Sequence, residues 1–207
     1  MEKWISDIYK ASIAKHKEYN LKDGMAVFYS PVVYKPKILF IGDNPGGGAG
    51  TIHHEPPITS EYAQENYRLA KMMRLIFSTQ ELTKIINAGV ITNRVFFQSK
   101  NIDELKKQGR WKEMEKWCFP HVKKIIENIN PEIIFAESID TYEKLIYGLK
   151  GKFGEVLVAD NGRGLLRSGE ISGKLVLGIK HPTGGRQHIS HDNWKTVTHK
   201  LSDIIVR

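Results

Sequence analysis

Four short runs rich in apolar residues constrain the fold of this chain more than any other feature. They occupy residues 37–42 (KILFIG), 90–97 (VITNRVFF), 132–138 (EIIFAES) and 174–182 (KLVLGIKHP). Runs this short and this continuously apolar are typical of strands buried on both faces of a parallel sheet. Longer amphipathic stretches separate them, so the pattern predicts βαβ units.

The amphipathic stretches supply the helices that would cover such a sheet. Apolar residues recur at helical spacing in 4–13, 61–77, 112–130, 139–149 and 192–206, with an interruption expected at Pro120. We therefore predict an α/β fold with three layers, α/β/α, around a four-stranded, mainly parallel sheet. The length of 207 residues suits a single domain over 1–207.

Composition narrows the class of protein. Hydrophobic residues make up 41% and charged residues 26%, which is typical of a folded globular chain rather than a disordered one. The single cysteine, Cys118, excludes an internal disulfide, a four-cysteine zinc site and a cysteine-ligated iron–sulfur cluster. Residues 1–19 do not have the pattern of a signal peptide, and no apolar run reaches the roughly 18–20 residues of a membrane span. We expect a cytoplasmic protein without membrane association.

Positive charge is concentrated in two segments. The chain carries 31 Lys and Arg against 23 Asp and Glu, a net charge of +8. Residues 94–124 hold nine basic and four acidic residues, and 161–207 hold eight and three, so both segments adjoin predicted strands. This clustering favours a polyanionic partner, with solvated helix faces as the alternative.

Polar residues lie within or directly after the predicted strands, toward their carboxyl ends, at 43–46, 92–94, 137–138 and 181–183. In parallel α/β sheets, ligands bind outside the carboxyl ends of the strands, so these residues are the candidates for a site. The glycine-rich segment 42–51 (GDNPGGGAGT) lacks the lysine of a P-loop and the spacing of a dinucleotide-binding turn. A plain flexible loop is the alternative there.

Histidines raise the alternative of a metal site. The candidates are His53, His54, His181, His188 and His191. The spacing of His188 and His191 matches no common zinc pattern. We therefore predict neither a metal nor another cofactor.

The four strand ends together resemble the uracil-DNA glycosylase superfamily. KILFIGDNPGG, VITNRVFF, NPEIIFAES and LVLGIKHPTGG occur in the order and approximate spacing of that superfamily, over roughly 37–194. The GxNPG form of the first motif is most similar to the mismatch-specific uracil/thymine branch. The ITN and HP motifs are more similar to the thermostable iron–sulfur branch, whose four cysteines this chain lacks.

The resemblance implies a function and a set of roles. Such enzymes flip a nucleotide out of the duplex and hydrolyse its N-glycosidic bond. By motif position, His181 would donate to the uracil oxygen that gains charge, Asn44 would hold the attacking water, and Asn93 would read the base. Asp43 is an alternative base if the strand has turned before it. The remaining residues implied are Gly42, Pro45, Gly46 and Phe97 around the base, and Thr183, Gly184, Arg186, Gln187 and His188 against DNA.

Two parts of the family pattern have no clear match. Pro56 and Pro57 stand where the aromatic that stacks on the base is expected, leaving His54, Tyr62 or Phe97 as substitutes. Residues 183–188 hold no large apolar side chain to fill the vacated stack, leaving Arg186, Gln187 or His188.

Three functions stay open. The first is a DNA glycosylase of base excision repair, acting as a monomer on uracil-containing or mismatched DNA. The second is a catalytically weak or inactive nucleic-acid-binding protein of the same fold. The third is a nucleoside or nucleotide N-ribohydrolase.

Overall fold

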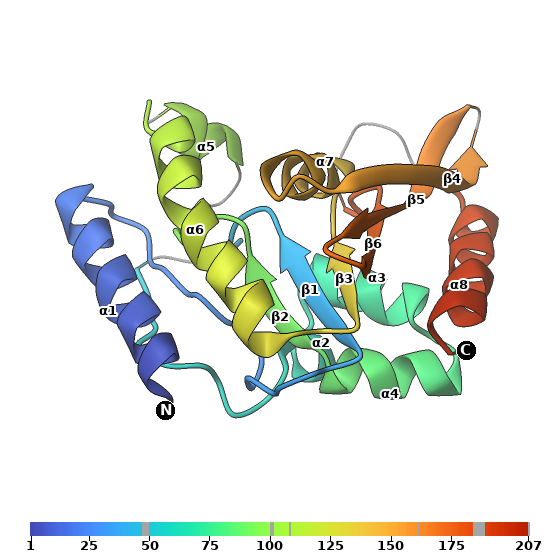
Figure 1. Cartoon of the computed structure of the whole chain (residues 1–207), viewed down its shortest axis with the longest axis horizontal. Helices are drawn as coiled ribbons and strands as arrows, with labels where there is room; N and C mark the ends of the chain where they lie inside the picture. Colours follow the sequence, from blue (N-terminus) through green and yellow to red (C-terminus); the bar gives the residue numbers. More distant parts are fainter. Residues whose placement is uncertain (47–49, 100–101, 108, 161, 184–188, 207) are drawn as a thin grey trace.

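The computed structural model describes residues 1–46, 50–99, 102–107, 109–160, 162–183 and 189–206. Their core is a six-stranded mixed sheet with the strand order β2-β1-β3-β6-β5-β4 (Figure 1). The strands are β1 (Ile38–Gly42), β2 (Val90–Asn93), β3 (Ile133–Ala136), β4 (Lys152–Asp160), β5 (Arg163–Ile171) and β6 (Lys174–Ile179).

The four predicted strands are neighbours in this sheet, and all three of their pairings are parallel. The prediction of a four-stranded sheet is nevertheless wrong, because β5 and β4 extend it beyond β6 by antiparallel pairing. Charged residues and glycines interrupt both added strands, and most of β4 is exposed. Antiparallel strands that face water on one side need no continuous apolar run, so β4 and β5 lack the sequence pattern of buried strands.

Helices cover both faces of the sheet (Figure 1). On one face lie α1 (Lys3–Glu18), α6 (Trp111–Ile129) and α7 (Ile139–Gly148), and on the other lie α2 (Glu61–Gln64), α3 (Arg68–Ile76), α4 (Gln80–Ala88) and α8 (His191–Ile205). The short helix α5 (Ile102–Lys107) precedes α6. Successive residues of β1 alternate between the two apolar cores: Leu39 and Ile41 join the first, and Ile38 and Phe40 join the second.

The helix predicted over 61–77 is divided in two. A guanidinium nitrogen of Arg74 in α3 accounts for the break, because it donates to the backbone carbonyls of Tyr62 and Glu65 at 2.7 Å each. These bonds satisfy carbonyls at the end of α2 that a longer helix would have used itself. The next helix, α4, was not predicted; the Thr79 hydroxyl caps its start by accepting from the Leu82 N–H.

Helix α6 continues through Pro120, contrary to the expected interruption. Its buried residues Met114, Cys118, Val122 and Ile125 form one apolar face, whose packing outweighs the hydrogen bond that proline cannot make. Cys118 is fully buried, and burial raises the pKa of its thiol to about 12. Among the helices described, none is long and apolar enough to cross a membrane.

Candidate functional site

A cavity of about 850 Å³ opens at the carboxyl ends of the four parallel strands. Residues at or after every one of these strands line it, as do residues of α2 and the segment that leads into α3. The predicted site residues that line it are Gly42, Asp43, Asn44, Pro45, Gly46, Asn93, His181 and Thr183. The fold therefore brings together residues that lie up to 141 positions apart in the sequence.

Backbone hydrogen bonds fix the walls of the cavity. The N–H of Arg94 donates to the carbonyl of Gly42 at 2.8 Å, and the N–H of Val95 donates to that of Asp43 at 2.9 Å. Farther along, the Ser99 N–H donates to the Pro45 carbonyl at 3.1 Å. The segment after β1 thus stays paired with the segment after β2, so both enter the site in a fixed orientation.

The side chain of Asn44 is held by its amide nitrogen. This Nδ2 donates to the Ser99 hydroxyl at 2.9 Å and to the Pro45 carbonyl at 3.1 Å. Within the described part of the chain, no group donates to Asn44 Oδ1. That oxygen is available to accept a hydrogen bond from a ligand or a water molecule.

Asn93 brings a side-chain amide to the wall of the cavity. It ends β2 opposite Gly42, and only 8% of its surface is exposed. No hydrogen bond to its side-chain amide forms among the residues that the structure describes. A buried amide without a partner costs free energy, so a molecule that pairs with both ends of this amide would bind favourably.

Gly42 permits two side-chain oxygens to converge beneath the cavity. A Cβ on Gly42 would lie 2.3 Å from Asn93 Oδ1 and 2.9 Å from Glu137 Oε2. Any larger residue would displace one or both of them. This close approach, rather than an unusual backbone angle, is the reason for a glycine at the end of β1.

Glu137 is a buried acid at the end of a predicted strand, and its sequence position alone indicates no role for it. Only 3% of its surface is exposed, and its Oε1 accepts a hydrogen bond from the buried Tyr62 hydroxyl. Burial raises the pKa of Glu137 to about 8, and the charge of Asp43 adds to the rise, while the Tyr62 bond opposes it. Its signal in the sequence is an acid that directly follows an entirely apolar strand.

His181 is a neutral imidazole with its hydrogen on Nε2. The backbone N–H of Thr183 donates to His181 Nδ1 at 3.3 Å, so this nitrogen must be the acceptor of the ring. Burial lowers the pKa of His181 below its ordinary value, although the charge of Asp43 partly opposes the shift. The ring can therefore donate from Nε2 at neutral pH.

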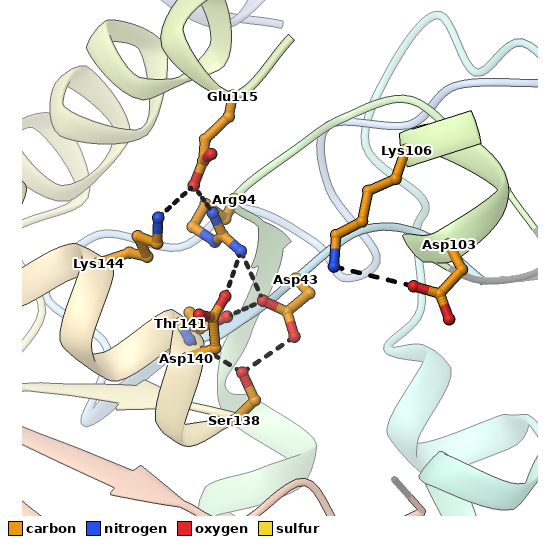
Figure 2. Close-up of polar contacts among 9 residues, drawn as sticks. All are labelled: Asp43, Arg94, Asp103, Lys106, Glu115, Ser138, Asp140, Thr141 and Lys144. Carbon is orange, nitrogen blue, oxygen red and sulfur yellow. Dashed lines mark hydrogen bonds and ion pairs between the residues drawn. The ribbon is translucent and has the colours of Figure 1, made fainter. Parts of the chain in front are cut away.

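Asp43 belongs to a buried ion-pair network rather than acting as a free base (Figure 2). Its carboxylate accepts from Arg94 Nη2 and from the Ser138 hydroxyl at 2.9 Å each, and also from the Thr141 hydroxyl. Burial alone would raise the pKa of Asp43, but Arg94 and the two hydroxyls bring it below its ordinary value. A carboxylate with so many donors is a poor proton acceptor.

The same network fixes Arg94. Its side chain is 1% exposed and also pairs with Glu115 and with Asp140, the latter at 2.9 Å. Figure 2 shows these carboxylates arranged around the guanidinium. The network ties the end of β1 to α6 and α7, so it holds the floor of the cavity in place.

Phe97 does not line the cavity. Strand β2 ends at Asn93, and the chain then turns so that Phe97 packs in the core, with ring centroids 5.7 Å from Tyr19 and 5.9 Å from Trp117. The aromatic residues that do line the cavity are Tyr29, Tyr62 and Tyr67; His54 is not among the lining residues. Of these three tyrosines, only Tyr62 is a candidate from the sequence.

The predicted DNA-contacting residues Gly184, Arg186, Gln187 and His188 lie outside the described residues. No group of three or more His, Cys, Asp or Glu suited to a metal ion occurs in the described ranges.

Carboxylates gather on the more exposed side of the cavity. Glu61, Glu65 and Asp103 line it there, beside the guanidinium of Arg68. Burial raises the pKa of Glu61 to about 7; the charge of Glu65 also raises it, whereas the Tyr67 hydroxyl lowers it. This part of the cavity suits neutral or positively charged groups better than anions.

Comparison with known proteins adds no functional assignment. No protein-family model matches the chain, and no curated protein matches it. Function is therefore inferred from the groups that meet in the cavity, which are an unpaired amide, a neutral imidazole and a buried carboxylic acid.

Proposed function

We propose that this chain is a DNA glycosylase of base excision repair, hydrolysing the N-glycosidic bond of uracil or of another deaminated or mismatched base. The observation that carries the proposal is the buried, unpaired amide of Asn93 in the same cavity as neutral His181. The amide offers one donor and one acceptor, which complement O4 and N3–H of uracil. Cytosine presents the reverse pattern, so the same amide would discriminate against it.

His181 supplies stabilisation of the leaving base. Uracil departs as an anion, and its O2 gains charge as the glycosidic bond breaks. The Nε2–H of a neutral imidazole donates to that oxygen without a proton having to be transferred. A preorganised donor of this kind contributes about 2.7–4 kcal/mol to stabilisation of the transition state.

Asn44 positions the water that attacks the sugar. Because its nitrogen is held by Ser99 and Pro45, its Oδ1 has a fixed direction and accepts a hydrogen bond from that water. An amide oxygen does not remove a proton at neutral pH, so we expect slower hydrolysis than a carboxylate at this position would give. The net charge of +8 supports a DNA partner.

The test is base excision from synthetic oligonucleotides. Purified protein is incubated with uracil opposite guanine, uracil opposite adenine, single-stranded uracil, hypoxanthine or xanthine, and abasic sites are then cleaved by alkali. We expect cleavage with at least one substrate, and a loss of about a hundredfold or more in His181→Ala. The matched control is His199→Ala, since His199 lies exposed on α8.

The absence of cleavage with every substrate would refute the proposal. Salt-dependent DNA binding without release of any base, unchanged in His181→Ala, would identify a nucleic-acid-binding protein without catalysis instead.

A nucleoside N-ribohydrolase is the second candidate. The carboxylates Glu61, Glu65 and Asp103 favour it, because they would repel DNA phosphates yet accept hydrogen bonds from ribose hydroxyls. Turnover of free uridine or inosine, together with negligible affinity for DNA, would identify this activity.

A further inference from the structure

Two side-chain oxygens that ordinarily accept hydrogen bonds lie close to Gly42 in the lining of the cavity. Asn93 Oδ1 and Glu137 Oε2 lie 2.3 and 2.9 Å from the position of a Cβ on Gly42, and all three residues line the cavity. Glu137 Oε2 therefore lies on the same side of Gly42 as the Asn93 amide, at the wall of the cavity where a molecule paired with that amide would lie.

Tyr62 determines which oxygen of Glu137 carries the hydrogen when the acid is protonated. The Tyr62 hydroxyl donates to Oε1, so Oε1 is the carbonyl-like end of the acid and Oε2 is its hydroxyl end. The ring of Tyr62 is itself fixed edge-on against Phe40, with centroids 5.6 Å apart. The acid is thus held with its hydroxyl beside Asn93.

The surroundings of Glu137 keep it protonated at neutral pH. The titratable groups around it are Tyr62 from α2 and Asp43 after β1, with His181 after β6 lining the same cavity. Burial and the Asp43 charge raise the pKa of Glu137 to about 8 despite the bond from Tyr62.

We propose that Glu137 is a further base-reading residue, whose Oε2–H donates to the bound base beside the Asn93 amide. The site then presents three groups to the base in a row: a donor (Asn93 Nδ2–H), an acceptor (Asn93 Oδ1) and a second donor (Glu137 Oε2–H). The complementary row is the imide of uracil, thymine and xanthine, in which two carbonyls flank one N–H. This inference rests on the proposed function, since it assumes that the cavity binds a base.

The row defines a substrate class. Hypoxanthine has one carbonyl beside its N–H and leaves the Glu137 hydroxyl without an acceptor, whereas cytosine places a donor where the row requires an acceptor. A site built to hydrogen-bond a group strongly rejects an analogue that lacks it. The second imide oxygen has two lone pairs, so Glu137 and His181 can both donate to it.

The experiment measures binding of free bases by calorimetry, which requires no catalysis. Uracil is compared with 4-pyrimidinone, which lacks only the 2-carbonyl, in the wild-type protein and in Glu137→Gln and Glu137→Met. We expect the preference for uracil to fall about tenfold in Glu137→Met, the effect of one hydrogen bond. Glu137→Gln keeps the preference, because its amide nitrogen donates in place of Oε2–H and its oxygen still accepts from Tyr62.

A pH series provides a second readout if Glu137→Met does not fold. Wild-type affinity for uracil weakens between about pH 6.5 and pH 8.5 as Glu137 loses its proton, and Glu137→Gln lacks that decline. Glu61→Gln is the control, since Glu61 also titrates in this range and its variant retains the decline.

An unchanged uracil preference in Glu137→Met, or an equal pH dependence in Glu137→Gln and the wild type, would overturn this inference and leave the base site intact. Failure of both bases to bind any variant or the wild type would instead overturn the proposed function, and this inference with it.

Discussion

Because Gly42 has no side chain, it leaves room for the side chains of Asn93 and Glu137 in the site. In Gly42→Ala, the new methyl would sit 2.3 Å from Asn93 Oδ1 and 2.9 Å from Glu137 Oε2, so both groups must move. We expect affinity for uracil to fall at least tenfold, measured by calorimetry. Gly46→Ala is the matched control: Gly46 lines the same cavity, and nothing lies within 4 Å of its added Cβ. Equal effects of the two substitutions would contradict this account.

Arg94 compensates buried negative charge. Arg94→Met leaves Asp43 buried without its cation, and we expect the free energy of unfolding to fall by about 3–5 kcal/mol in urea titrations. Because the pKa of Asp43 is lowered in the fold, its stabilisation is present above the unfolded value near 3.9 and is lost as the pH falls. The loss in free energy of unfolding caused by Arg94→Met should therefore be smaller at acidic pH. The exposed Arg163→Met, which should cost far less, is the control.

Helix α6 contains a proline, Pro120, whose replacement should stabilise the fold. Pro120 is exposed and lies inside the helix, so it costs the bond to the Lys116 carbonyl without contributing to the core. We expect Pro120→Ala to raise the free energy of unfolding by about 2 kcal/mol, after the greater freedom of the unfolded chain is allowed for. Thermal unfolding measures the change, with the exposed Lys112→Ala as the control. A lower melting temperature would show that Pro120 is needed for the packing of α6.

Elements differ in how far the sequence predicts them. Strands β1, β2, β3 and β6 are buried on both faces, so they appear as continuous apolar runs. The hairpin of β4 and β5 has no such signal, and the break between α2 and α3 depends on Arg74, which lies in the second of the two helices. Long-range contacts of this kind leave no local pattern in the chain.

The residues of the site also differ in how far the sequence predicts their positions. The strand-end positions of Asn44, Asn93 and His181 were predictable, because parallel strands end at one edge of a sheet. The orientation of the Asp43 side chain was not predictable, since it depends on the guanidinium of Arg94, 51 residues away. Tyr29 and Tyr67 belong to segments that only the folded chain brings to the cavity.

Two carboxyl groups, Glu137 and Glu61, should each make the folded molecule less stable as the pH rises through neutrality. Glu137 and Glu61 have pKa values of about 8 and 7 in the fold against an ordinary 4.5, so the folded chain binds more protons than the unfolded chain between these limits. Glu137→Gln removes one of these groups. We expect its stability relative to the wild type to increase by more than 1 kcal/mol between about pH 5 and pH 8.5, followed by urea unfolding. A pH-independent difference would show that Glu137 is ionised in the fold.

Because Cys118 is buried, a fluorescent dye can be attached selectively to a cysteine introduced elsewhere in this chain. The Cys118 thiol is fully buried with a pKa of about 12, and the sequence contains no other cysteine, so thiol-reactive dyes have no exposed thiolate to attack in the native protein. A cysteine introduced at an exposed position, such as Lys112 on α6 or His199 on α8, would be labelled selectively. Fluorescence signals from such a dye would then report on ligand binding in an otherwise native background.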